Sequence, residues 1–385
     1  MIRIIRCSVL IIIFGLHGNL SAQTEYEITG YFINMPLYQK PSKEFTEIFG
    51  YDNNILTNIS RLRIRPTLYF TNDIWLNTEY EINSLLFNSA GLFNLLEITN
   101  SRRQLIDLSW NLSSGNQLII NHFIDRLYLK YNFEFGDITI GRQRIAWGTG
   151  RVWNPTDLFN PINPANFAKT EKDGVDAISF KWNSGNFTDI NFVFNPSKKI
   201  SNSNYGFRFR TNYNEYDFSI VSGNFDDSYI IGCDFAGNLY DAGIRGEGIY
   251  SFEDNNSDGY LKYILGLDYQ FTPQFYSAIE YHYNGKGKEG IFNYELNELL
   301  NGKILNLGKH YFYLGSSYLL SPLFTLTFSN IFNINDSSGY VILSGNYSLS
   351  DNIDASIGLQ KTYGNKFSEY WYYPVSYYLK CEMFF

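Results

Sequence analysis

The sequence predicts an all-β protein, a transmembrane antiparallel β-barrel of about 18 strands. Three observations support this. Segments of about ten residues alternate apolar and polar side chains, the N-terminus is built like an export signal, and the last segment alternates up to a terminal phenylalanine. A strand of about ten residues with one apolar face is long enough to cross the hydrocarbon layer of a bilayer. About 16 strands would also fit the length of the chain.

The composition excludes several other classes of protein. The 385 residues are 44% hydrophobic and include 32 Tyr and 32 Phe, which is too apolar for a disordered chain. No run of about 18 apolar residues is present, which excludes a bundle of transmembrane helices. The 30 Lys plus Arg are outnumbered by 38 Asp plus Glu, so no binding of nucleic acid is expected. Cys233 and Cys381 are too far apart to indicate a metal site, and we expect no metal or cofactor.

The N-terminus has the parts of a secretory signal peptide. Two arginines precede a short apolar run at 7–16, and Ser21 and Ala22 supply the small residues of a peptidase site. The run is too short to span a bilayer. We therefore expect residues 1–22 to be removed and residues 23–385 to form a single barrel domain.

Alternation of period two recurs along the rest of the chain. In the clearest segment, 260–271, leucines and aromatic residues occupy one face, while Lys262, Asp268 and Gln270 occupy the other. Helical spacing does not recur, so these segments are predicted to be strands. The same parity predicts apolar outward faces on 127–133, 190–194, 240–252 and 353–359.

The strand count should be even, because both ends of such a barrel lie on the periplasmic side. We expect longer connections at 88–122, 148–174 and 285–309. The count closes at about 18 strands if 88–122 is one excursion, although 105–112 inside it could itself form a strand. Short turns are expected at 71–73, 134–136, 183–186, 214, 236–238, 272–273, 321–322 and 350–351.

Prolines test this assignment, because a closed barrel has no free edge at which a strand tolerates one. Eight of the ten prolines fall in the expected loops or turns. Pro374 lies near the start of the last strand. Pro66 falls inside a strand expected at 60–70, and we predict a bulge there.

The C-terminal segment is the sharpest single signal. Apolar residues occupy every second position up to the last residue, Phe385. This resembles the last-strand recognition signal of bacterial outer-membrane barrels. The resemblance implies a location in the outer membrane of a Gram-negative bacterium, with outer-membrane lipid and the barrel assembly machinery as partners. The alternating residues are Val375, Tyr377, Leu379, Cys381, Met383 and Phe385.

Residues 125–176 combine two good strands with a long connection rich in proline and asparagine. Arg142-Gln143-Arg144 is followed by Trp147-Gly148, and prolines at 155, 161 and 164 prevent the strand from continuing. This stretch resembles a segment of porin-like outer-membrane channel proteins, and with the C-terminal strand the resemblance covers roughly a fifth of the chain. It implies a loop, 148–174, that either folds into the lumen and constricts the pore or caps the barrel from outside. The residues expected in this loop are Arg151, Trp153, Asn154, Asp157, Asn160, Glu171, Asp173 and Asp176.

Basic residues are expected to face the lumen. On the strand near residue 64, apolar outward positions such as Leu62 and Ile64 force the intervening arginines inward. Arg142 and Arg144 share the parity of Ile138 and would need a bulge near Gly141 to point inward. The predicted basic wall comprises Arg61, Arg63, Arg65, Arg126, Lys130, Arg142, Arg144, Arg208 and Arg210. Alternatively, these cations are salt-bridge partners that pin the loop to the wall.

The resemblance implies a porin that lets small hydrophilic solutes diffuse passively through a water-filled barrel. Opposed acidic and basic walls would create a transverse field, and inward arginines would favour anions. Two alternatives remain: a structural or ligand-binding barrel without an open channel, and an outer-membrane hydrolase. A hydrolase is less favoured, because only three histidines lie beyond the signal and no serine lies in a nucleophile-elbow motif. We therefore expect that the chain is not an enzyme. The sequence does not decide whether it forms a homo-oligomer.

Overall fold

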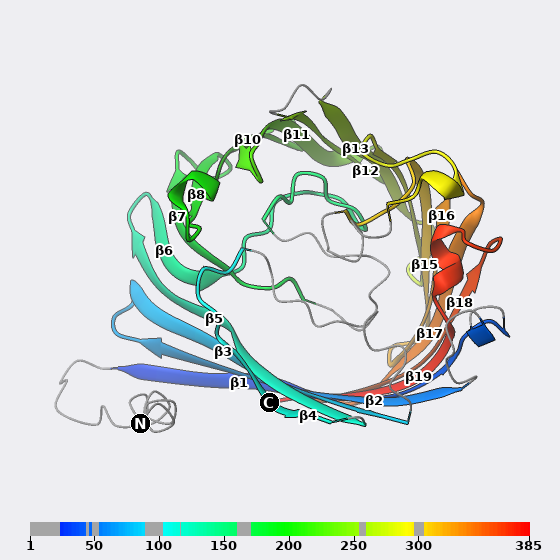
Figure 1. Cartoon of the computed structure of the whole chain (residues 1–385). Helices are drawn as coiled ribbons and strands as arrows, with labels where there is room; N and C mark the ends of the chain where they lie inside the picture. The colour runs from blue at the N-terminus through cyan, green and yellow to red at the C-terminus, as the bar shows by residue number, and fades with distance from the viewer. Residues whose placement is uncertain are drawn as a thin grey trace.

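The computed structural model describes residues 24–43, 46–47, 54–88, 103–115, 117–159, 171–253, 259–295 and 304–385. The predicted signal peptide, 1–22, lies outside this part of the chain. No helix in the described part has the length and apolar character to cross a membrane. Figure 1 views the molecule along its axis and shows strands arranged in a ring around a central space.

Antiparallel strands make up most of the described chain. β19 pairs with β1, which closes the sheet into a barrel. The strands are β1 (Glu25–Lys40), β2 (Ile55–Tyr69), β3 (Ile74–Phe87), β4 (Ser109–Ser114), β5 (Leu118–Phe133), β6 (Gly136–Gln143), β7 (Val175–Asn183), β8 (Asp189–Asn195), β9 (Asn204–Tyr213), β10 (Tyr216–Phe225), β11 (Ser228–Leu239), β12 (Ala242–Glu253), β13 (Tyr260–Gln270), β14 (Phe275–Asn284), β15 (His310–Ser321), β16 (Phe324–Asn333), β17 (Ser338–Ser350), β18 (Ile353–Tyr363) and β19 (Val375–Phe384). Within the described residues, three short 3₁₀ helices lie between them: η2 (Ile200–Asn202), η3 (Ile291–Asn293) and η4 (Glu369–Tyr372).

The circumference is 18 strands, which confirms the predicted fold class. β3 pairs with β5 along most of its length. On the other edge of β5, β6 pairs with 127–133 and β4 pairs with 119–123. β4 and β6 therefore share one position in the wall. The strand considered for 105–112 exists as β4, but it begins later, at Ser109, and it does not add a position to the circumference.

Seven of the eight expected turns connect consecutive strands as predicted, and one is wrong. The turn expected at 236–238 lies inside β11, and the chain turns instead at Tyr240 and Asp241. The turn was predicted from Gly237, but this glycine is needed for packing within the sheet and not for a turn. A Cβ on Gly237 would lie 2.4 Å from Cδ1 of Tyr216 on the neighbouring strand. The glycine thus makes room for an aromatic ring within the sheet.

Pro66 lies within β2, and the bulge predicted there is absent, because β2 keeps one register with both β1 and β3. The ladder between β2 and β3 skips Arg65 and Pro66 and resumes in the same register. The register shift occurs between β3 and β5, where Glu79 pairs with Arg126 and the next residue of β3 pairs with Ile124. The extra residue is Asp125. Asp125 and Arg126 are consequently both buried on the lumen side, as a bulge allows.

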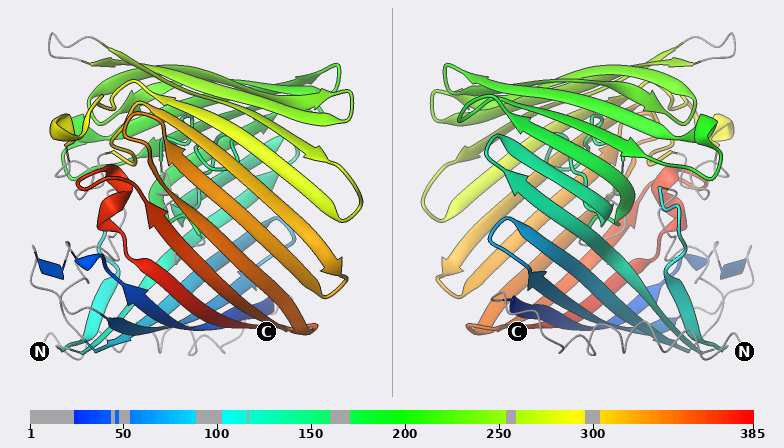
Figure 2. Two further views of the ribbon diagram at one scale, coloured as in Figure 1. Left: turned by 90° about the vertical axis from the view of Figure 1, so that its right-hand side faces the viewer. Right: turned by 90° about the vertical axis from the view of Figure 1, so that its left-hand side faces the viewer.

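The outer surface carries the predicted apolar face. Leu265, Ile357 and Leu379 are more than half exposed, and each lies on the face predicted to point outward. Figure 2 shows the strands tilted across the barrel, with the C-terminus at one end. Phe385 closes the ring by exchanging two backbone hydrogen bonds with Gly30, at 2.8 and 3.0 Å. A closed barrel with an apolar outer surface leaves no unpaired edge in lipid.

A buried carboxylate, Glu369 in η4, fastens the connections at the end opposite the short turns. Its Oε1 accepts the N–H of Leu307 at 3.0 Å, and its Oε2 accepts Tyr311 Oη at 2.6 Å and Asn333 Nδ2 at 2.7 Å. Its own N–H donates to Asp336 at 2.8 Å. Burial raises the pKa of Glu369 to about 7.

This network should weaken as the pH rises. The folded network holds a proton on Glu369 that an opened one releases near pH 4.5, so its stability falls between pH 4.5 and about 7. We expect the protection of the Leu307 amide from hydrogen exchange, relative to that in Glu369→Gln, to fall at least about tenfold over this range. A ratio of the two protection factors that does not change with pH would show that Glu369 does not titrate in this range.

Candidate functional site

After β6 the chain leaves the wall and enters the barrel. Residues 144–159, here called the inner segment, cross the interior towards β12 and β15, as the teal trace in Figure 1 shows. The segment forms no regular structure, so its N–H groups need partners other than a strand ladder. Two glutamates of the opposite wall supply many of them.

Glu247 of β12 holds the first part of the inner segment. Its Oε2 accepts the N–H of Thr149 at 2.6 Å and that of Gly150 at 3.3 Å. Its Oε1 accepts the N–H of Thr156 at 3.1 Å. The carboxylate is almost completely buried, so these bonds replace its contact with water.

Glu280 of β14 holds the next residues in the same way. Its Oε2 accepts the N–H of Arg151 at 2.7 Å, and its Oε1 accepts those of Val152 at 3.2 Å and Trp153 at 2.9 Å. The Trp153 ring stacks on His282, with centroids 5.1 Å apart and 18° between the planes. Backbone and ring together fix this part of the segment to β14.

Apolar side chains attach the two ends of the inner segment to other strands. Trp147 and Phe159 pack edge to face at 5.2 Å, and Phe159 packs on Phe225 of β10 at 4.9 Å. They join a buried cluster with lumen-facing residues of β7, β8, β10, β11 and β12: Val175, Ala177, Val193, Val221, Ile230 and Ile249. Part of the lumen is therefore filled by a small apolar core.

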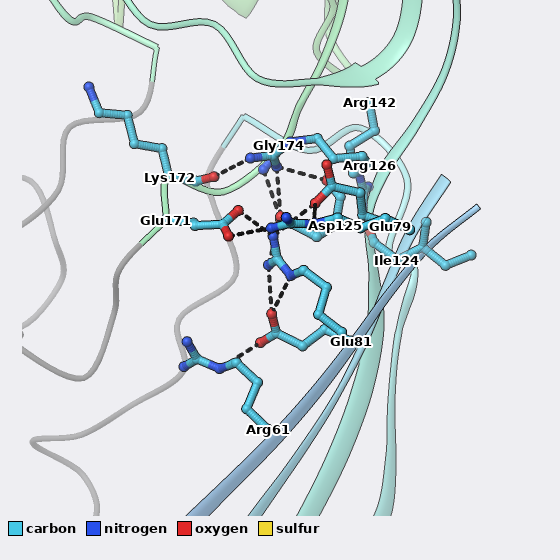
Figure 3. Close-up of polar contacts among 12 residues, drawn as sticks. Arg61, Glu79, Glu81, Ile124, Asp125, Arg126, Arg142, Glu171, Lys172 and Gly174 are labelled. Atoms are coloured by element: carbon cyan, nitrogen blue, oxygen red, sulfur yellow. Dashed lines mark hydrogen bonds and ion pairs between the residues drawn. The ribbon is translucent and has the colours of Figure 1, made fainter. Parts of the chain in front are cut away.

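The stretch that leads back to the wall, residues 171–174, docks on β2 and β5 (Figure 3). Glu171 contacts Arg63 at 2.7 Å and also pairs with Arg65. The carbonyl of Lys172 accepts a bond from Arg126, and the N–H of Gly174 donates to Asp125 Oδ1 at 3.0 Å. The acidic loop and the basic wall, which were predicted to face each other across the pore, are in direct contact here.

Arg63 is the centre of this ionic cluster. It is almost completely buried and lies within 3.0 Å of carboxylate oxygens of Glu79, Glu81 and Asp125, in addition to Glu171. Arg61 pairs with Glu81 at 3.2 Å. Acidic residues of β3 and β5, together with Glu171, thus neutralise the arginines of β2, and the wall carries interleaved charges.

The other predicted cations of the wall have separate environments. Lys130 lies 3.4 Å from Asp137 and Arg210 lies 2.7 Å from Asp189. Arg208 donates to Ser219 Oγ at 3.0 Å, with Asp234 at 3.9 Å. Arg144 is exposed at the start of the inner segment and has no ionic partner in the described part of the chain.

Arg142 lies in the barrel wall where β6 ends. It donates to Asp176 at 2.7 Å and to the carbonyl oxygens of Ile124, at 3.0 Å, and Ile106. The bulge expected near Gly141 is absent, because β6 stays in register on both sides. Arg142 and Asp176 therefore share the parity of the exposed Ile140 and brace the outer side of the wall.

The remaining predicted loop residues are placed as follows. The Asn154 side chain packs on Gly148, Asp157 contacts Lys172 Nζ, and Asp173 lies within the stretch that docks on β2 and β5. Asn160 lies outside the described residues. No group of three or more metal-ligating side chains occurs in the described part of the chain. A role in a pore stays a prediction for all of these residues.

Sequence analysis missed the two glutamates that hold the inner segment. Each occupies an inward position between outward residues, so parity alone could have placed them in the lumen. Their partners are backbone groups of a loop about 100 residues away, at separations of 98 and 129 residues for the shortest bonds. No side-chain pattern signals such a contact.

Comparison with known proteins supports the fold. OccK7 (OpdD) of Pseudomonas aeruginosa matches with a TM-score of 0.57 at 9% identity, over 94% of this chain and 99% of that chain. The chain has a porin-like fold. A Rhodopseudomonas blastica porin mutant matches with a TM-score of 0.49 at 10% identity, over 94% of this chain and 100% of that one. No protein-family model and no curated protein matches the sequence.

The closed barrel and its apolar outer surface are those of a β-barrel that spans a membrane, which agrees with the expected location in a bacterial outer membrane. Four expectations stay predictions: that the chain is a single domain, that the signal peptide is removed, that the barrel assembly machinery recognises the last strand, and that the protein can form a homo-oligomer.

Replacing both loop-holding carboxylates should release the inner segment. Glutamine offers one acceptor oxygen where each carboxylate accepts three N–H groups, and each charge-assisted bond contributes about 1.5–3 kcal/mol. In a chain lacking Cys233 and Cys381, we expect the buried Thr156→Cys thiol to react at least about tenfold faster with a methanethiosulfonate reagent after E247Q/E280Q.

The matched control for this experiment is Glu369→Gln, which alters a buried carboxylate that makes no bond to the inner segment. It should leave the labelling rate of the thiol unchanged. Equal rates in E247Q/E280Q and the parent would show that the two carboxylates do not hold the segment.

Proposed function

We propose that the chain is an outer-membrane channel through which small hydrophilic solutes diffuse passively. The observation that carries the proposal is the inner segment, an irregular loop held inside a closed barrel by Glu247 and Glu280. Irregular backbone at membrane depth is tolerated where it is buried in protein or lines a water-filled cavity. The inner segment and residues 171–174 would form the constriction.

The charges that a solute meets favour anions. Although the ionic pairs nearly balance, the cation is the more exposed partner in several of them. Arg210 is 42% exposed against 10% for Asp189, and Arg151 is 48% exposed against 13% for Asp268. Because selectivity follows the charge that faces the solution, we propose an anion bias despite the net charge of -8.

A barrel without an open channel is the second candidate. It is favoured by the apolar cores that the inner segment builds with the wall, around Trp147 on one side and Trp153 on the other. Catalysis has no such support. His282 is buried under Trp153, while His122 and His310 each pair with a tyrosine hydroxyl at 2.8 and 2.7 Å.

Liposome swelling separates the two candidates. Vesicles that contain the purified protein should swell in isotonic solutions of uncharged sugars, because a passive channel needs no charge on its solute. Protein-free vesicles are the control. Absence of swelling with every sugar would favour the closed barrel and contradict the channel.

Reversal potentials in planar bilayers test the anion bias. Under a potassium chloride gradient, the sign of the potential should report preferential passage of chloride. Arg210→Gln should reduce the preference, since it removes an exposed guanidinium and leaves Asp189 unpaired. A cation-selective parent protein would contradict the bias while leaving the channel intact.

A further inference from the structure

Arg151 differs from the other arginines inside the barrel in how its two ends are held. Its backbone N–H is fixed by Glu280 at 2.7 Å, and the two following N–H groups are fixed by the same carboxylate. Its side chain, in contrast, is 48% exposed. A rigid backbone thus presents a solvated guanidinium inside the barrel.

The acidic partner of Arg151 is weakly engaged. Asp268 Oδ2 lies 3.5 Å from one nitrogen of Arg151, at the limit of a hydrogen bond. The other oxygen of Asp268 contacts Arg245, which also donates to the carbonyl of Thr149 at 3.1 Å. One carboxylate, Asp268, is therefore shared by two guanidinium groups, and its contact with Arg151 is the longer one.

An aromatic ring supports the guanidinium from one side. The Cζ atom of Arg151 lies 5.8 Å from the centroid of the Tyr276 ring on β14, a distance typical of a cation–π contact. The ring limits the orientations of the planar group without using its N–H donors. An arginine held in this way can offer two parallel N–H groups to an oxyanion.

Two other arginines of the lumen already contact carboxylates closely. Arg210 donates to Asp189 from two nitrogens, at 2.9 and 2.7 Å, and Arg63 contacts four carboxylates. An incoming oxyanion would have to displace these close pairs, whereas at Arg151 it displaces a single contact of 3.5 Å.

We propose that Arg151, backed by Tyr276, is a weak binding site for small oxyanions, carboxylates or phosphates, on the path through the barrel. The proposal deepens the channel function and rests on it. Carboxylate and phosphate oxygens share the geometry that a guanidinium recognises, so both classes would bind. Uncharged solutes would pass without binding there.

Block of the chloride current in planar bilayers tests the site. Citrate and inorganic phosphate, added separately at millimolar concentrations, should reduce the single-channel current of the parent protein. In Arg151→Gln the concentration for half block should rise at least about tenfold for whichever anion binds, since a charge-assisted bidentate contact is lost. Block by one anion alone would identify its class as the ligand.

Two further variants separate a specific site from general electrostatics. Arg151→Lys keeps the charge but loses the fork of donors, so its block should be intermediate. Lys181→Gln removes a charge from β7 elsewhere in the barrel and should leave the block unchanged. Equal weakening by Arg151→Gln and Lys181→Gln, or no weakening by Arg151→Gln, would overturn the site while the channel stands.

Calorimetric titration of the detergent-solubilised protein makes the result independent of conduction. If the parent conducts no current, the proposed channel fails. Binding of citrate or phosphate that disappears in Arg151→Gln would then still support the site, and absence of binding in the parent would overturn it. Resistance of each folded variant to SDS before heating verifies that the barrel is intact.

Discussion

The structure depends on one constraint, the need of an irregular segment inside a barrel to satisfy its backbone polar groups. Burying an unpaired N–H costs several kcal/mol in an apolar environment. Glu247 and Glu280 meet this need by accepting the N–H groups of residues at 149–153 and 156. The two carboxylates gain partners for their charge, and the segment gains a fixed position.

A second consequence of the inner segment concerns the wall that it leaves. β6 pairs only with the second half of β5, at 127–133. The first half of β5 pairs with β4 instead, at 119–123. Arg142 bridges β5, β7 and the carbonyl of Ile106 at this point. The departure of the inner segment into the lumen and the pairing of β4 with β5 are thus linked, because β4 occupies the position in the wall that β6 leaves.

Much of the fold could be predicted from the sequence, because period-two alternation fixes which side chains face lipid. The outward positions of Leu265 and Leu379 follow from it directly. Ionic partners across strands could not be predicted, since they depend on register. The arginines of β2 meet Glu79 and Glu81 only because β3 is aligned with them, and the bulge that adds Asp125 lies on a third strand. For this reason the walls expected to carry opposite charges carry interleaved ones.

The position of the inner segment is tested most directly by residue-resolved hydrogen exchange of the intact protein in micelles. The amides of Thr149, Arg151 and Trp153 should exchange as slowly as those of the adjoining strands, although they belong to no strand. Rates typical of a solvated loop at these residues would show that the segment is not held within the barrel, and the account of the lumen would be wrong.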